Sequence, residues 1–200
     1  RERHVVRRAI VHGSQGIESR RGASGHAENP FIALMDKDAN EDRGEVYGFS
    51  LVYSGNFLAS VDVDQYDTTR VVMGINPFDF SWKLESGEEF ITPEVVMVYS
   101  NAGIGQMSRS YHRIYRNNLM KSKYKNIERP IVINNWEATY FNFNEEKIKE
   151  IAKQGSELGM EMMVLDDGWF GKRDSDNSSL GDWFVDKAKL PNGLYNLAEA

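Results

Sequence analysis

The stretch Met160-Glu-Met-Met-Val-Leu-Asp-Asp-Gly-Trp-Phe-Gly171 decides how the rest of the chain is interpreted. Its apolar run, Met162–Leu165, predicts a strand buried on both faces, as in a parallel sheet covered by helices. The run ends at Asp166 and Asp167, and a glycine and two aromatic residues follow. Carboxylates beside a buried strand cost free energy unless a partner binds them. The pair is therefore a candidate ligand site at the carboxyl end of a strand.

A second strand and a helix precede this run. Ile131–Ile133 is a short apolar segment that ends in Asn134-Asn135-Trp136. Asn144 is typical of a helix N-cap, and Gly159 is typical of the residue that ends a helix. Strand, helix and strand within about 35 residues predict a βαβ unit with parallel strands and a right-handed crossover. Both strands then end at the same rim, where we expect Trp136 and the two aspartates to face a common cleft.

The adjacent aspartates suit sugar binding better than acid–base catalysis. The two carboxylates of a glycosidase flank the scissile bond at roughly 5–10 Å from each other, whereas these neighbours reach a ligand from one side. Side by side, they accept hydrogen bonds from neighbouring hydroxyls such as a sugar diol, and charged acceptors make the stronger bonds. Two alternatives stay open: an aspartate that caps the next helix, and a salt bridge to Lys172 or Arg173.

Two tryptophans are expected to line the mouth of the same cleft. Trp136 follows the first strand and Trp169 follows the aspartate pair. An aromatic face packs well against the C–H face of a pyranose, and it packs equally well in a protein core. We therefore expect Asp166, Asp167, Trp136 and Trp169 to bind substrate, and we assign no catalytic residue.

The sequence predicts no metal ion and no cofactor. Asp174–Ser178 resembles the start of a calcium loop, but it lacks the glycine at loop position six, and Val185 stands where a bidentate acid is required. There is no cysteine, and the four histidines have no metal-ligand spacing. No glycine-rich phosphate loop follows either strand. His26 lies in the segment Ser24–Pro30, which is more typical of a surface loop than of a site.

The N-terminal half is predicted to be an antiparallel β-sandwich, because short strands alternate with regular turn signals up to about residue 100. His4–Val11 is rich in strand formers, and Gly13–Gly25 is typical of a loop. A period of two predicts one shared, dry face for Tyr47, Phe49, Leu51 and Tyr53. A short turn then predicts a hairpin between this strand and Phe57–Val63.

The periodicity becomes helical near residue 107, where Met107, Tyr111 and Ile114 share a face. The polar segment 121–129 is predicted to link two domains, 1–120 and 130–200. A (β/α)8 barrel needs about 250 residues, so we expect residues 130–200 to be its first two β/α units. The chain is accordingly expected to be truncated at both ends, with residues 1–120 forming the C-terminal part of an N-terminal sandwich domain.

Composition restricts the partners. The net charge of −6 argues weakly against nucleic acid and anionic membranes. No apolar run approaches the ~20 residues of a membrane span. The absence of cysteine fits a reducing compartment. Aromatic residues make up 12% of the chain, with four tryptophans, which is frequent in sugar-binding proteins and in large cores alike.

With these residues considered, the chain resembles the bacterial α-galactosidases of glycoside hydrolase family 36. The resemblance is strongest in Arg129–Phe141 and Val164–Arg173. Weaker support comes from four further segments: Arg21–Ser24, Gly44–Phe57, Asn76–Trp82 and Gly181–Trp183. The family's Ser-Ser-His-Gln-His-Asn-Pro loop appears here as Ser24-Gly-His-Ala-Glu-Asn-Pro30, so the resemblance assigns this loop no role.

The resemblance implies an N-terminal β-supersandwich, a (β/α)8 catalytic barrel and a small C-terminal β domain, in a homotetramer of the bacterial cytoplasm. It implies that Asp166 and Asp167 hold hydroxyls of the terminal galactose, and that Trp136 shapes the cleft and stacks on the substrate. The family hydrolyses terminal α-galactosides of the melibiose and raffinose type with retention. Its nucleophile, which follows a Lys-Trp-Asp motif, and its acid/base aspartate have no counterpart in these 200 residues.

Three other functions stay open from the sequence. A raffinose synthase or an α-N-acetylgalactosaminidase is the nearest enzyme alternative. A non-catalytic carbohydrate-binding protein, in which the sandwich alone binds the sugar, is the alternative from another class.

Overall fold

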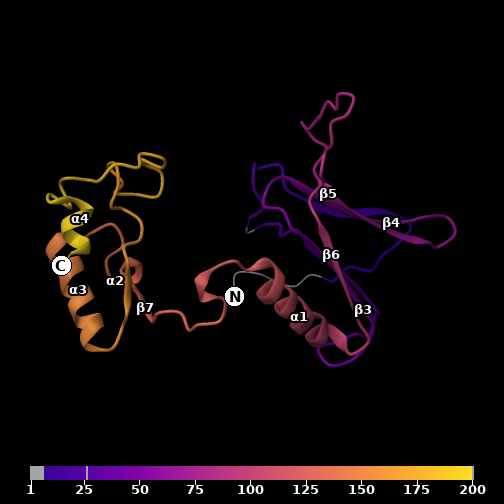
Figure 1. The fold of residues 1–200 in the computed structure, drawn as a ribbon, viewed down its shortest axis with the longest axis horizontal. Coiled ribbons are helices and arrows are strands. Elements are labelled where there is room, and N and C mark those ends of the chain that lie inside the picture. Colours follow the sequence, from indigo (N-terminus) through magenta and orange to yellow (C-terminus); the bar gives the residue numbers. More distant parts are fainter. Residues whose placement is uncertain (1–6, 26, 200) are drawn as a thin grey trace. The chain divides into compact units, whose positions relative to one another are not determined.

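The chain divides into two compact units, Arg1–Lys121 and Ser122–Ala200, and a computed structural model describes residues 7–25 and 27–199 of it (Figure 1). The first unit contains β1 (Gly13–Glu18), β2 (Phe31–Met35), β3 (Val46–Leu51), β4 (Phe57–Val63), β5 (Thr69–Ile75), β6 (Val95–Ser100), α1 (Gly103–Ile114) and a π-helical turn (Tyr115–Leu119). The second contains a 3-10 turn (Lys123–Lys125), β7 (Val132–Asn134), α2 (Trp136–Thr139), α3 (Glu145–Glu157), β8 (Met162–Val164) and α4 (Gly193–Ala198). In the described part of the chain, no helix is both long and apolar enough to cross a bilayer.

The first unit is a sandwich of two antiparallel sheets with the strand orders β1-β4-β5 and β2-β3-β6. Leu51 of one sheet packs with Phe57 and Ala59 of the other, and these three side chains are at most 3% exposed. Burial of apolar area between two sheets is the main favourable term that holds such layers together. The predicted antiparallel sandwich is thus confirmed.

The predicted hairpin is wrong. β3 pairs with β2 and β6, whereas β4 pairs with β1 and β5. The segment between β3 and β4 therefore crosses from one sheet to the other instead of reversing the chain within a sheet. The reason lies in its two ends, since Leu51 and Phe57 enter the same core from opposite layers.

The predicted dry face of β3 is only partly correct. Leu51 is buried, but Tyr47 and Tyr53 are 40% and 39% exposed. The opposite face, which carries Val46 and Ser50, is buried instead, at 0% and 8% exposed. One face of the strand is therefore covered by α1, whereas the other packs on the second sheet at its Leu51 end.

Close packing of α1 on this face depends on a glycine. A Cβ at Gly48 would lie 2.7 Å from Sδ of Met107 and 2.7 Å from Cε2 of Tyr111. Those two helix residues are 4% exposed and belong to one cluster with Val46. The helical face predicted from the spacing of Met107 and Tyr111 is confirmed, and its partner is a strand that has no side chain at the point of contact.

The predicted strand and the predicted loop at the N-terminal end of the chain are both wrong within the described residues. Residues 7–11 form no strand, whereas Gly13–Glu18, predicted to be a loop, forms β1 along β4. The composition of β1 does not indicate a strand, and the neighbouring β4 supplies its hydrogen-bond partners. His26 and residues 4–6 lie outside the described residues.

The second unit begins with the predicted βαβ arrangement. β7 and β8 are parallel, with Val132 opposite Met162 and Asn134 opposite Val164, and α3 connects them (Figure 1). The N-cap prediction is confirmed, because the Asn144 side chain accepts the backbone N–H of Lys147 at 3.0 Å. This parallel pair is the opening of the predicted (β/α)8 barrel.

Burial of β8 on both faces is not observed. Met162 is 44% exposed and Val132 on the neighbouring strand is 46% exposed. Within the described residues the sheet has only these two strands. An apolar run thus indicates that a strand requires burial on both faces. The two barrel strands among the described residues provide only part of that burial.

Candidate functional site

Two asparagines connect the carboxyl ends of β7 and β8. Nδ2 of Asn134 donates to Oδ2 of Asp166 at 2.6 Å, and Oδ1 of Asn134 accepts the backbone N–H of Trp136 at 2.7 Å. Asn135 is 0% exposed; its Oδ1 accepts the backbone N–H of Asp166 at 2.8 Å and its Nδ2 donates to Oγ1 of Thr139 at 2.8 Å. The first strand end therefore sets the position of the carboxylate at the second.

The two aspartates are both half-buried but differ in their partners. Oδ1 of Asp166 accepts the backbone N–H of Asp167 at 2.7 Å. Oδ1 of Asp167 accepts the backbone N–H of Gly168 at 2.7 Å and Nε–H of Arg173 at 2.5 Å. Among the described residues, none donates a hydrogen bond to Oδ2 of Asp167. The Arg173 guanidinium lowers the pKa of Asp167, so this carboxyl stays ionised to lower pH than an ordinary aspartate.

The turn after the aspartates requires glycine. Gly168 has φ +91°, a conformation that side chains strongly disfavour. A Cβ there would also lie 3.1 Å from Cδ1 of Phe141. The turn brings Asp167 back toward Arg173 along the same loop.

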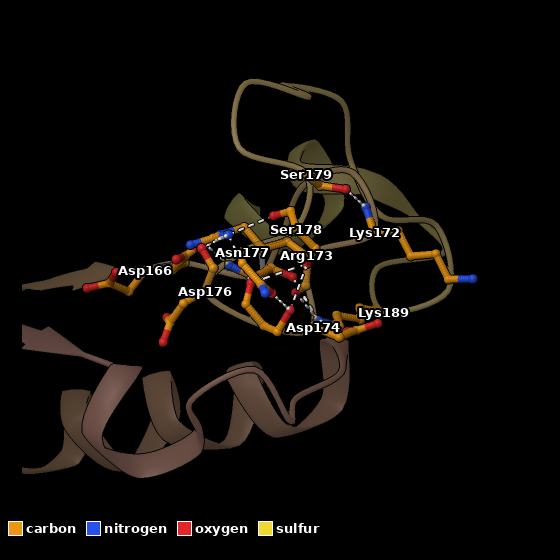
Figure 2. Close-up of polar contacts among 12 residues, drawn as sticks. Asp166, Lys172, Arg173, Asp174, Asp176, Asn177, Ser178, Ser179 and Lys189 are labelled. Carbon is orange, nitrogen blue, oxygen red and sulfur yellow. Dashed lines mark hydrogen bonds and ion pairs between the residues drawn. The ribbon is translucent and has the colours of Figure 1, made fainter.

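Arg173 is the centre of this loop, as Figure 2 shows. The residue is 4% exposed, and its Nη1 donates to the carbonyl oxygens of Ser175, Asp176 and Ser178 at 2.9, 3.2 and 2.7 Å. The segment that resembled a calcium loop thus directs three carbonyl groups at a guanidinium. Among the described residues, no group of three or more acidic, histidine or cysteine side chains is arranged to hold a metal ion.

Lys189, which lies further along the chain, stabilises the same loop through hydrogen bonds and an ion pair. Its Nζ donates to the carbonyl oxygens of Gly168 and Arg173 at 3.0 and 3.1 Å and forms an ion pair with Asp174 at 2.9 Å. The ion pair lowers the pKa of Asp174. Lys172 extends away from the cluster (Figure 2), so of the two salt bridges that the sequence left open, the structure forms the one with Arg173.

The two tryptophans belong to separate aromatic clusters. Trp136 meets Tyr140 and Phe141 edge to face, with ring centroids 5.2 and 4.9 Å apart. Trp169 meets Phe170 at 5.2 Å and Trp183 at 6.4 Å. Within the described residues, no ring contact joins Trp136 to Trp169. The structure thus links Trp136 to the aspartates through Asn134, and Trp169 through the loop itself.

A pocket of about 410 Å³ lies beside this loop. Its lining residues are Phe143, Gly171, Lys172, Asp174, Asp186, Ala188 and Lys189. None of the four predicted substrate-binding residues lines it. The candidate site is therefore defined by the polar network at the strand ends and not by this pocket.

Sequence reasoning gave no role to three residues that organise the site. The sequence pattern places Asn135 at a strand end, offers Arg173 only as a salt-bridge partner of the aspartates, and does not indicate Lys189. The position of Asn135 directly after an apolar strand segment is a usable signal, since an amide that becomes buried there must find partners. Lys189 has no local signal, because its partners lie 16 and 21 residues away.

A β-sandwich followed by the first two strands of a (β/α)8 barrel, with two carboxylates at the end of the second strand, fits the class of glycoside hydrolases. The family model described as Melibiase matches residues 89–200, and that described as the glycosyl hydrolase family 36 N-terminal domain matches residues 1–85. The chain belongs to this family of glycoside hydrolases, family 36.

Individual relatives agree with this assignment. The chain is 63% identical over 199 residues to alpha-galactosidase AgaA of Geobacillus stearothermophilus, covering 100% of this chain and 27% of that protein. It is 53% identical over 193 residues to alpha-galactosidase 1 of Pediococcus pentosaceus, covering 96% and 26%. A crystal structure of a variant of AgaA in complex with raffinose matches all of this chain and 28% of that one, with a TM-score of 0.91. The chain thus spans about a quarter of the length of these relatives.

Proposed function

We propose that the polypeptide carrying this chain is an α-galactosidase that hydrolyses terminal, non-reducing α-D-galactose from oligosaccharides of the melibiose and raffinose type. Membership of family 36, the names of the relatives and the raffinose complex of AgaA support this proposal. They favour it over a raffinose synthase, an α-N-acetylgalactosaminidase or a non-catalytic binding protein. The reaction proceeds with retention by double displacement, and the nucleophile and the acid/base lie outside residues 1–200.

The role of this chain is to hold the terminal galactose. The observation that carries this role is the pair of half-buried carboxylates, Asp166 and Asp167, at the joined ends of two parallel barrel strands. Ionised carboxylates bind neighbouring hydroxyl groups through charge-assisted hydrogen bonds. Trp136 and Trp169 supply the aromatic surfaces on which the pyranose ring packs.

The domain organisation belongs to the same proposal. Residues 1–120 form the C-terminal part of the N-terminal sandwich domain, 121–129 form the linker, and 130–200 begin the catalytic barrel. The compact units found here, with their division after Lys121, support these boundaries. The complete enzyme is a homotetramer in the bacterial cytoplasm.

Substitution of each aspartate in the complete polypeptide tests the proposal. Asp166→Ala and Asp167→Ala are each expected to lower kcat/KM for an aryl α-galactoside, because each lost charge-assisted hydrogen bond removes about 1.5–3 kcal/mol of transition-state stabilisation. Glu157→Ala, which removes an exposed carboxylate from α3, serves as the matched control with wild-type kinetics. Wild-type kcat/KM in both aspartate variants would show that galactose is held elsewhere.

A further inference from the structure

We propose that Arg173 is a positioning residue, which orients Asp167 so that a single carboxylate oxygen, Oδ2, is offered to a sugar hydroxyl. The inference rests on the proposed function, because it assigns a role within the proposed galactose site. Arg173 itself does not touch the sugar; it acts through Asp167.

The guanidinium is held at both of its ends. Nε–H donates to Oδ1 of Asp167, while Nη1 donates to the three carbonyl groups of the loop at Ser175, Asp176 and Ser178. A guanidinium is planar and presents its N–H groups in a fixed fork. With its far side fixed to three carbonyls and its side chain 5% exposed, it has one orientation in which Nε reaches Asp167. The direction of the carboxylate is therefore set by the loop.

The hydrogen bonds on Asp167 are all on one oxygen. Oδ1 accepts from both Arg173 and Gly168, which uses the two acceptor positions of a carboxylate oxygen. Among the described residues, Oδ2 has no donor. Asp166 differs, because each of its oxygens accepts one hydrogen bond, from Asn134 and from the backbone of Asp167. Adjacent carboxylates thus present different faces to a ligand, and Asp167 offers only Oδ2.

The same contact extends the pH range in which Asp167 is ionised to lower pH. The hydrogen bond from Arg173 is the largest cause of the lowered pKa of this carboxyl, and the Gly168 N–H adds to it. Removal of the guanidinium would free Asp167 to rotate and would raise its pKa. Both changes weaken a charge-assisted bond to a sugar hydroxyl, most strongly at acidic pH.

The experiment compares Arg173→Gln, Arg173→Lys and the control Lys172→Gln in the complete polypeptide. Lys172 is the neighbouring cation and is exposed, and its side chain extends away from the cluster around Arg173 (Figure 2). The measurements are the inhibition constant of free galactose and the pH profile of kcat/KM with an aryl α-galactoside. We expect Arg173→Gln to raise the inhibition constant about tenfold and to move the acid limb of the profile to higher pH. Arg173→Lys should lie between this variant and the wild type, and Lys172→Gln should match the wild type.

A double-mutant cycle separates positioning from general support of the fold. In an Asp167→Asn background, Arg173→Gln should cause no further change in the galactose inhibition constant, because the carboxylate through which it acts is already gone. Full additivity of the two substitutions would overturn the inference. So would a uniform loss of kcat/KM at every pH with an unchanged inhibition constant.

The outcomes also distinguish this inference from the proposed function. If Asp167→Asn alone leaves galactose inhibition unchanged, the proposed galactose site is wrong. If Asp167→Asn weakens inhibition but Arg173→Gln does not, only the positioning role is wrong. Should Arg173→Gln fail to fold, Arg173→Lys decides the matter, and a wild-type acid limb and inhibition constant in that variant would refute the proposal.

Discussion

Removal of the Asn135 side chain is expected to loosen the end of β8 directly. In Asn135→Ala, the backbone N–H of Asp166 loses its acceptor, which lies 2.8 Å away in the wild type. The Thr139 hydroxyl loses one partner but keeps the carbonyl oxygens of residue 135 and Tyr140 as acceptors. The variant thus leaves one half-buried donor, the Asp166 N–H, without a partner and removes one further hydrogen bond, from Asn135 to Thr139.

The expected loss of local stability in Asn135→Ala follows from these contacts. An unsatisfied donor costs about 1–3 kcal/mol, and an ordinary hydrogen bond contributes about 0.5–1.5 kcal/mol. Together they give about 1.5–4.5 kcal/mol, which corresponds to about 10- to 2,000-fold in a local opening equilibrium. The backbone bond from the Asn135 N–H to the Val164 carbonyl does not involve the side chain, so the pairing of β7 with β8 should survive.

Hydrogen exchange measured by mass spectrometry on the complete polypeptide gives the local readout, since exchange reports opening segment by segment. Peptides that cover residues 164–168 should exchange faster in Asn135→Ala by about the factor derived above. The control is Asn142→Ala, which removes an exposed asparagine side chain from the same unit and is expected to change stability by less than about 0.5 kcal/mol. Equal exchange rates in Asn135→Ala and the wild type would refute the view that this buried amide holds the site together.

Three further predictions follow from the packing and the charges. Gly48→Ala should lower the free energy of unfolding by about 1–3 kcal/mol in denaturant titrations, because its Cβ would lie 2.7 Å from two helix side chains. The control is Gly74→Ala, which has open space around the added methyl group and should raise the free energy of unfolding by up to about 1 kcal/mol. Equal losses in both variants would contradict the packing argument. Asn144→Ala should cost about 1 kcal/mol by removing the α3 N-cap, measured in the same titrations, and no loss would mean that the cap contributes nothing. The pKa of Asp167 is lowered in the folded chain, so its ionised form stabilises that chain above pH 3.8, the ordinary aspartate pKa, and this contribution is lost as the pH falls below 3.8 through the folded-state pKa. The difference in unfolding free energy between the wild type and Asp167→Asn should therefore shrink in that range. A pH-independent difference would be inconsistent with the ion pair.

The barrel unit was the easier half to predict, for a local reason. Its strand, helix and strand are continuous in sequence, and its signals depend on residues close together in the chain. Asn144 caps a helix three residues from its partner Lys147, and the parallel pairing follows from the length of the crossover. The positions of Asp166 and Asp167 at a strand end could be predicted in the same way.

The sandwich was harder to predict, because an alternating pattern indicates a strand but does not indicate which other strand it pairs with. The alternation in β3 and β4 is real, yet the two strands belong to different sheets. The face of β3 that carries a glycine and a serine packs against α1, and the predicted dry face is buried only at its Leu51 end. Small residues indicate close packing only once the packing partner is known.

Local sequence patterns are sufficient to predict the class of each half, the parallel βαβ unit, and the carboxylates and tryptophans nearest the strand ends. Periodicity and caps are properties of neighbouring residues, and they can be inferred before the chain is folded. The folded chain is needed to see which sheet each strand joins, that Arg173 and not Lys172 pairs with Asp167, and that Lys189 holds the loop. Most of these pairings involve residues that are far apart in the chain. The folded geometry determines which of several possible partners lies within hydrogen-bond distance, and local sequence patterns do not contain that information.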